Sequence, residues 1–156
     1  MPFLSVEDPD RLNPLSDYPE QIPGSTNARS LDVADRLGIR GSRHVLGDPA
    51  DPNAPLAIFA TLPAGVVVPR HAHSCHRMEV IVRGSLTVDE TGEVLRPGQV
   101  MISAAGEFYG PHTVGAEGCA NVEFFSDRSG QEPYSEDGRP FADVLAELNG
   151  LSIEHT

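Results

Sequence analysis

Short apolar stretches separated by turns dominate the middle of the chain. In a β-strand successive side chains point to opposite faces, and strands of globular proteins are short, so runs of this kind bounded by Gly, Pro, Asn or Asp predict strands. Gly84 is expected to be a turn between two of them, and residues 104–118 and 126–140 are expected to be loops. The predicted strands cover residues 43–46, 56–62, 66–68, 78–82, 85–88, 93–95, 99–102 and 119–125.

Helical spacing occurs in two places. Apolar residues at 31, 33, 34 and 37 predict a short helical segment over residues 30–37, before Gly38. Apolar residues at 141, 144, 145 and 148 predict a helix over residues 141–148, which Asn149-Gly150 ends. A single helix cannot bury its own apolar face, so we expect this C-terminal helix to lie on the outside of the sheets.

The chain has 15 glycines and 14 prolines in 156 residues, which favours many short strands with tight turns over long helices. The pattern therefore predicts an all-β fold, either a barrel or a double-sheet jelly roll, whose interior has room for one small ligand. We divide it into an irregular, proline-rich N-terminal arm (1–40), a β-barrel (41–128), and a loop with a C-terminal helix packed on the barrel (129–156). The arm is either a disordered tail or a segment laid across a partner subunit.

Charge narrows the range of partners. The formal net charge is −12, which disfavours nucleic acid and anionic membranes, since both require a concentrated positive surface. No apolar stretch is long enough for a membrane span, and no apolar run follows a basic N-terminus, so we expect a cytoplasmic protein. The two cysteines, Cys75 and Cys119, form no recognisable pair; for Cys75 a packed side chain is favoured over a ligand or a redox-sensitive thiol.

Candidate chemistry is concentrated in the segment from His71 to Gly84. His71 and His73 are two residues apart, so on a strand their imidazoles point to the same face and can converge on one ion. A pair of solvated histidines at a strand end would have the same spacing.

The residues around this pair resemble the first motif of the cupin superfamily. Gly65, five residues, and then His71-Ala-His73 match that motif, and Gly84 follows His73 at the family's spacing. The family's glutamate position holds Arg77, and Glu79 comes two residues later. A strand keeps residues two apart on one face, so a bulge could return Glu79 to the ion.

A second cupin motif is matched more loosely. Gly98, five residues, and then Ala104-Ala-Gly106 fit it, with alanine in place of the family's proline. The position of the family's histidine holds Tyr109, and His112 follows three residues later. The resemblance covers residues 43–126 and implies a cupin-type double-stranded β-helix with a metal site inside.

The resemblance implies His71, His73 and His112 as metal ligands, with Glu79 as the fourth. Tyr109 is a less favoured oxygen ligand, and His76 is expected beside the ligands or exposed. Fe(II) is favoured because many small cupins are dioxygenases; Mn, Ni, Co and Zn suit the same ligands.

The resemblance further implies a metal-dependent enzyme that acts on a small oxygenated organic molecule, with an Fe(II) dioxygenase favoured. One alternative is a non-redox lyase or isomerase, in which Glu79 or Tyr109 moves a proton; another is a non-catalytic ligand- or metal-sensing cupin. Arg77 either turns inward to pair with Glu79 or a substrate carboxylate, or turns outward to solvent, and the outward position is favoured. We also expect a homodimer. The predicted apolar wall of the substrate site comprises Ile58, Phe59, Met101, Phe108 and Phe124.

Overall fold

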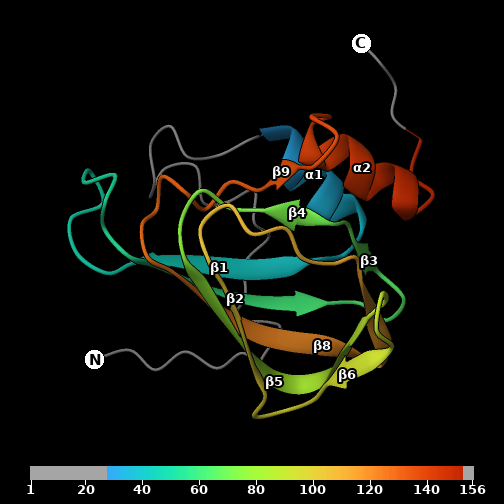
Figure 1. Cartoon of the computed structure of the whole chain (residues 1–156). Helices are drawn as coiled ribbons and strands as arrows, with labels where there is room; N and C mark the ends of the chain where they lie inside the picture. Colours follow the sequence, from blue (N-terminus) through green and yellow to red (C-terminus); the bar gives the residue numbers. More distant parts are fainter. Residues whose placement is uncertain (1–27, 153–156) are drawn as a thin grey trace.

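A computed structural model describes residues 28–152 of the chain (Figure 1). Most of the strands form one antiparallel seven-stranded sheet in the order β1-β2-β8-β5-β6, with β3 paired to β8 and β7 paired to β5. Strands β4 and β9 form a separate pair. The strands are β1 (Arg40–Val45), β2 (Leu56–Leu62), β3 (Val67–Val68), β4 (His71–Ala72), β5 (Arg77–Val88), β6 (Glu93–Leu95), β7 (Val100–Ser103), β8 (His112–Phe125) and β9 (Tyr134–Ser135).

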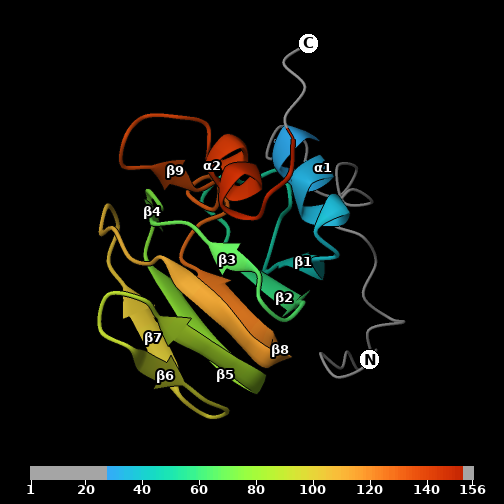
Figure 2. The ribbon, with the colours of Figure 1, turned by 90° about the vertical axis from the view of Figure 1, so that its right-hand side faces the viewer.

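Two helices, α1 (Ala28–Arg36) and α2 (Phe141–Leu148), lie together at one end of the sheet (Figures 1 and 2). Val33 of α1 packs into a cluster with Ala142, Leu145 and Ala146 of α2. Asn149, directly after α2, exchanges two side-chain hydrogen bonds with the backbone of Val67, each 2.8 Å long. The helix pair is therefore held on β3.

Most of the predicted elements are confirmed, including the strand over residues 56–62 and the helix over residues 141–148. Three predictions are wrong. The stretch predicted as loop over residues 126–140 contains the short strand β9. Strand β5 runs without a break through Gly84, where its register against β8 shifts, so this glycine marks an irregularity within a strand and not a turn. Strand β8 begins at His112, so the second half of the predicted loop over residues 104–118 is strand.

The structure confirms a mostly antiparallel β-sheet fold with two helices. Strands β1 and β6 are the two ends of the strand order, and within residues 28–152 no pairing joins them to close a barrel. Residues 1–27 of the predicted N-terminal arm (1–40) lie outside the part described, and the remainder of the arm contains helix α1 and the first residue of β1. Within the described part, no helix has the length and apolar composition needed to cross a membrane.

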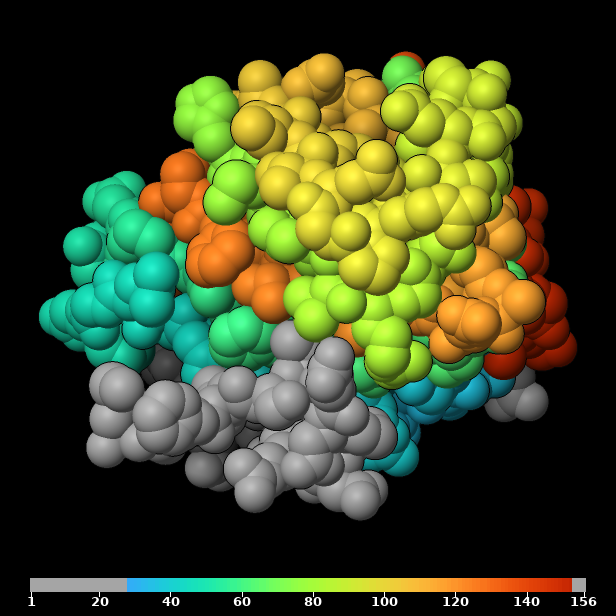
Figure 3. All heavy atoms as spheres, turned by 90° about the horizontal axis from the view of Figure 1, so that it is seen from below, coloured from blue at the N-terminus to red at the C-terminus, as the bar shows by residue number. Residues whose placement is uncertain are grey.

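Strands β5, β7 and β8 expose apolar side chains on the face turned away from the interior. Met78 is paired with both Ile102 and Phe124, and these three side chains are 37%, 74% and 38% exposed. Val100, on the same face of β7, is 47% exposed. The segment that holds β6 and β7 (yellow) covers much of the surface seen in Figure 3. Exposed apolar patches beside an edge strand are typical of protein–protein contacts.

The predicted homodimer stays a prediction, and we place its interface on this apolar face, against a second copy of the chain. We expect Ile102→Glu to reduce the mass measured by light scattering from two chains to one, because it inserts charge at the centre of the contact. The control is Leu148→Glu on α2, which replaces an equally apolar exposed residue, 47% exposed, and should keep the dimer. A wild-type mass of one chain would rule out the dimer.

Candidate functional site

Strand register places charged residues on the interior face of the sheet. Arg43 of β1 pairs with Ile58 of β2, Ile58 pairs with Glu123 of β8, and Glu123 pairs with Glu79 of β5. Residues paired in this way point to the same face. Arg43 and Glu79 are only 6% and 2% exposed, so the face is buried. Two carboxylates that lie directly opposite one another repel unless a cation lies between them.

Arg77 provides that cation. Its Nη2 donates to Glu79 Oε2 over 2.5 Å, and its Nε donates to Glu123 Oε2 over 2.9 Å. Asn121 Nδ2 donates to the other Glu79 oxygen over 2.5 Å. The outward position favoured for Arg77 from the sequence is therefore wrong, since the residue is 5% exposed and pairs with Glu79.

The two carboxylates keep Arg77 charged in its buried position. Burial by itself lowers the pKa of an arginine, but the attraction of Glu123 and Glu79 outweighs burial, so the pKa of Arg77 is raised. Its guanidinium also lies over the ring of Tyr109, 4.7 Å from the ring centroid, in a cation–π arrangement. Burial raises the pKa of Tyr109, which is therefore a neutral hydrogen-bond donor at neutral pH.

The ring of Tyr109 lies against all three predicted histidine ligands. Its centroid is 4.5 Å from that of His71, 5.8 Å from that of His112 and 6.2 Å from that of His73. Paired backbone hydrogen bonds of 3.0 Å between His71 and Tyr109 hold this arrangement. A contact of 2.6 Å between His71 Nδ1 and the carbonyl oxygen of Pro69 makes Nδ1 the protonated nitrogen.

The three histidines are buried and uncharged. Burial lowers the pKa of His71 to about 3 and the pKa of His73 to about 4, in both cases with the nearby charge of Arg77 acting in the same direction. Burial also lowers the pKa of His112. The three residues are 5%, 5% and 3% exposed and line the same cavity, while their predicted role as metal ligands stays a prediction.

These side chains line a cavity of about 180 Å³. One part of its wall is polar and contains the arginine–glutamate network, the histidines and Tyr109. Another part is apolar and comes from both the sheet and the helices. The sheet contributes Ile58, Ala60, Leu62, Leu86 and Phe125, and the helices contribute Leu31, Ala34 and Leu145.

Several polar atoms in the wall have no hydrogen-bond partner within the described part of the chain. The unpaired donors are Arg43 Nε and Nη1, Arg77 Nη1 and the hydroxyl of Tyr109; His73 Nδ1 and Asn121 Oδ1 are also unpaired. A buried polar group without a partner costs about 1–3 kcal/mol. Donors dominate this set of unpaired atoms.

The predicted four-ligand metal centre does not fit this arrangement. Glu79 is occupied by Arg77 and Asn121, so its oxygens are already hydrogen-bonded. The ring of Tyr109 lies against all three imidazoles, and the guanidinium of Arg77 lies over that ring, while His71 and His73 contact each other with ring centroids 5.2 Å apart. Within residues 28–152 no group of three or more His, Cys, Asp or Glu side chains is arranged to hold a metal ion. The predicted ligand set therefore stays a prediction, and the observed side-chain positions do not support it. That set is His71, His73, His112 and Glu79.

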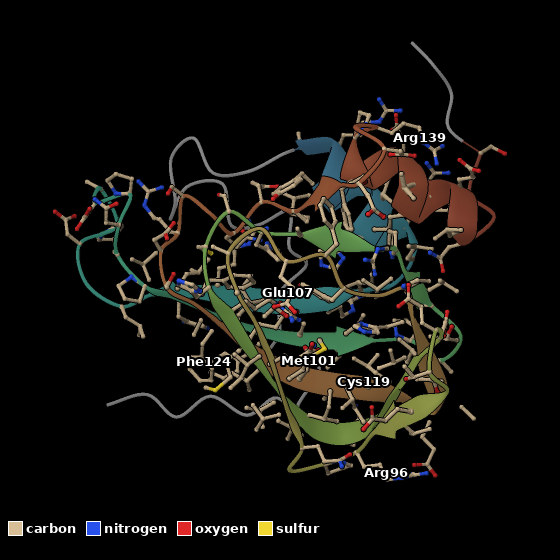
Figure 4. All side chains as sticks on the ribbon, in the orientation of Figure 1. Arg96, Met101, Glu107, Cys119, Phe124 and Arg139 are labelled. Carbon is tan, nitrogen blue, oxygen red and sulfur yellow. The ribbon has the colours of Figure 1, made fainter. Side chains whose placement is uncertain are left out.

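The predicted apolar wall is largely different from the one observed. Phe59 and Phe124 lie on the outer face of the sheet, because Ile58 and Phe125 occupy the inner positions and neighbouring strand residues alternate. Phe108 packs on Tyr134, with ring centroids 5.5 Å apart. Met101 pairs with Glu79 but is not among the residues that line the cavity. Figure 4 labels Met101 and Phe124, which lie on different strands.

Three interior residues were missed by the sequence analysis: Arg43, Asn121 and Glu123. The signal was present in the predicted strand over residues 119–125, where the inward positions of an alternating pattern are Cys119, Asn121, Glu123 and Phe125. A charged residue at an inward position of an apolar strand indicates a buried partner.

Two other residues of the histidine-rich segment do not belong to the polar part of the cavity wall. Cys75 is 3% exposed and packs in a cluster with Leu56, Ile58, Ala60 and Phe125, which confirms the packed interpretation. His76 is exposed and accepts a hydrogen bond from the backbone of Ala105.

We expect the protein to lose stability as the pH falls from 7 to 5. The unfolded chain takes up protons at His71 and His73 near pH 6.5, whereas the folded chain does so only near pH 3 and 4. Protons therefore favour the unfolded state in this window, and each imidazole should cost about 2 kcal/mol of unfolding free energy at pH 5. Urea denaturation at both pH values measures the loss. His73→Gln should reduce the pH-dependent part of this loss.

No protein-family model and no curated protein matches the sequence. Solved structures do match. An acetylacetone dioxygenase from Acinetobacter johnsonii has a TM-score of 0.51 and 13% sequence identity, covering 74% of this chain and 79% of that chain. A protein of unknown function with a cupin-like fold from Ralstonia eutropha JMP134 has a TM-score of 0.50 and 18% identity, covering 73% and 74%.

A mutant of Bacillus subtilis oxalate decarboxylase is also similar to this chain, but the match covers a smaller part of that protein than of the two proteins above. Its TM-score is 0.50 at 18% identity, and the match covers 73% of this chain but 33% of the decarboxylase chain. Identities this low carry the fold alone and leave the chemistry of the site open. On the strand order and these structural matches together, the chain has the cupin fold.

Proposed function

We propose that this chain binds a small oxygenated organic molecule inside the cavity, and holds it by hydrogen bonds from the protein instead of through a resident metal ion. The observation that carries the proposal is the set of unpaired buried donors on Arg43, Arg77 and Tyr109 in the cavity wall. A ligand oxygen that accepts from these groups would remove the cost of leaving them unpaired.

The shape and composition of the cavity support a small ligand. Pockets for drug-sized molecules are commonly about 300–1,000 Å³, and this one is about 180 Å³. Its wall combines apolar side chains with a few polar groups, which is the usual composition of a ligand site. The apolar part would cover a short alkyl group, while the polar part would orient the oxygens.

The same donors suit catalysis on a carbonyl group. A guanidinium and a neutral tyrosine hydroxyl that are already held in place can stabilise negative charge as it develops on a carbonyl oxygen.

Two of the structural neighbours are, by name, enzymes of small oxygenated molecules, a dioxygenase and a decarboxylase. The metal-dependent dioxygenase, and the metal-dependent lyase or isomerase, stay predictions from the sequence. Both need a set of metal ligands, and Glu79, the predicted fourth ligand, is hydrogen-bonded to Arg77 and Asn121.

The proposal is tested in two steps on the same preparation. Elemental analysis of anaerobically purified protein should find transition metals well below one ion per chain. A screen of small ketones, aldehydes, amides and acids by ligand-observed NMR should then find binders. Ala60→Leu, which fills the cavity from its apolar side, should abolish that binding. Ala116→Leu, at an exposed position on β8, is the control and should retain it.

The wild type could instead contain nearly one ion of iron, manganese, nickel, cobalt or zinc per chain, and His73→Ala could lose it. That result would overturn the proposal of metal-independent binding and support the predicted metal centre. Binding that persists in a folded Ala60→Leu variant would place the ligand elsewhere. Circular dichroism confirms that the variant is folded.

A further inference from the structure

From the charges around the cavity we infer that its ligand is an uncharged carbonyl compound and not a carboxylate. This inference rests on the proposed function, and it specifies the class of molecule that the same site takes.

The positive charge of Arg77 is already neutralised. Its Nε and Nη2 donate to Glu123 and Glu79, at 2.9 Å and 2.5 Å. The guanidinium therefore has two carboxylate partners before any ligand enters. Its remaining nitrogen, Nη1, is an unpaired donor without surplus positive charge behind it.

Among residues 28–152, the charged side chains that line the cavity sum to one negative charge. Arg43 and Arg77 are the two cations, and Glu79, Glu123 and Glu132 are the three anions. Glu132 and Glu123 are the charges that act on the guanidinium of Arg43. The three histidines add no charge because they are buried and neutral. A carboxylate in this cavity would be a fourth anion beside two cations, which is costly in a buried site.

The hydrogen-bonding groups nevertheless require acceptors. Four unpaired donor positions lie on Arg43, Arg77 and Tyr109, whereas Asn121 Oδ1 is an unpaired acceptor. Carbonyl oxygens accept hydrogen bonds without bringing a charge. A ketone, aldehyde or amide therefore satisfies the donors and leaves the charge balance unchanged, which a carboxylate cannot do.

The test uses three probes with the same heavy-atom skeleton: pentane-2,4-dione, acetoacetamide and acetoacetate. The first two are uncharged at pH 7 and the third is an anion. Dissociation constants are measured by ligand-observed NMR on protein of known metal content, with a chelator present. We expect pentane-2,4-dione and acetoacetamide to bind, and acetoacetate to bind at least about tenfold more weakly.

A charge variant separates this inference from simple shape selection. Glu123→Gln keeps the size of the side chain and removes one negative charge next to Arg77. This variant should lower the dissociation constant of acetoacetate about tenfold relative to that of acetoacetamide, because the positive charge of the guanidinium is then neutralised by one carboxylate fewer. Glu132→Gln, which removes a charge next to Arg43, is used if Glu123→Gln does not fold.

Each result decides a specific point. Acetoacetate binding as tightly as acetoacetamide to the wild type would overturn the inference and leave the proposed function standing. The inference is also overturned if the screen finds only acids as ligands. It is overturned as well if neither charge variant changes the ratio of the dissociation constants of acetoacetate and acetoacetamide. Absence of any binder that Ala60→Leu displaces would overturn the proposed function itself.

Discussion

Replacing Arg77 with methionine is expected to lower the free energy of unfolding by about 3–5 kcal/mol, the usual cost of removing one partner of a buried ion pair. The change leaves Glu79 and Glu123 opposite one another inside the sheet, where they are cross-strand partners. The buried carboxylate of Glu79 and the partly buried one of Glu123 repel without a cation, and each loses a hydrogen bond, of 2.5 and 2.9 Å respectively. Urea denaturation monitored by circular dichroism measures the loss.

Two further variants make this prediction specific to the buried charges. Arg83→Met removes an arginine from the same strand at an exposed position, and should change stability by no more than about 0.5 kcal/mol. Adding Glu79→Gln and Glu123→Gln to Arg77→Met should recover much of the lost stability, because no unpaired charge then remains. A triple variant as unstable as Arg77→Met would show that packing of the arginine, and not its charge, is what matters.

Replacing Gly84 with alanine is expected to destabilise the protein by about 3 kcal/mol, the sum of backbone strain and overpacking. Gly84 has φ +71°, a left-handed conformation that residues with a Cβ adopt at a cost. Its added Cβ would also overlap the backbone carbonyl of Gly118 on the neighbouring strand. Because both atoms belong to strands β5 and β8, neither can move without breaking their pairing. Thermal and urea denaturation measure the loss.

Gly65→Ala separates the two contributions. Gly65 has φ +79°, close to that of Gly84, but a Cβ at this position would meet nothing within 4 Å. It should therefore show the backbone strain alone, about 1 kcal/mol. Equal losses in the two variants would contradict the steric part of the explanation.

The fate of the predicted turn at Gly84 shows one limit of sequence reasoning. A glycine between two alternating apolar runs usually indicates a hairpin, and the local pattern contained nothing against it. The glycine is required here by the close approach of a different strand, which lies more than 30 positions away in the sequence. Local patterns do not contain such approaches.

The wall of the cavity shows another limit. Adjacent strand residues such as Ile58 and Phe59 cannot both face inward, yet both were predicted to line the site. The structure turns Ile58 inward and Phe59 outward, because the register with β8 places Ile58 opposite Glu123. Register between distant strands decides which of the two faces is buried.

The sequence alone determined the class of fold, the inward-facing histidine pair and the C-terminal helix. Those features depend on spacing within a few residues, where the twofold period of strands and the 3.6-residue period of helices apply directly. The tertiary structure alone decided the character of the site. Pairing of β5 with β8 places Glu79 opposite Glu123 and holds Arg77 between them, and pairing of His71 with Tyr109 places an aromatic ring among the imidazoles. Charges that are distant in the sequence affect one another only after folding brings them together in a buried interior, where their interaction is strong.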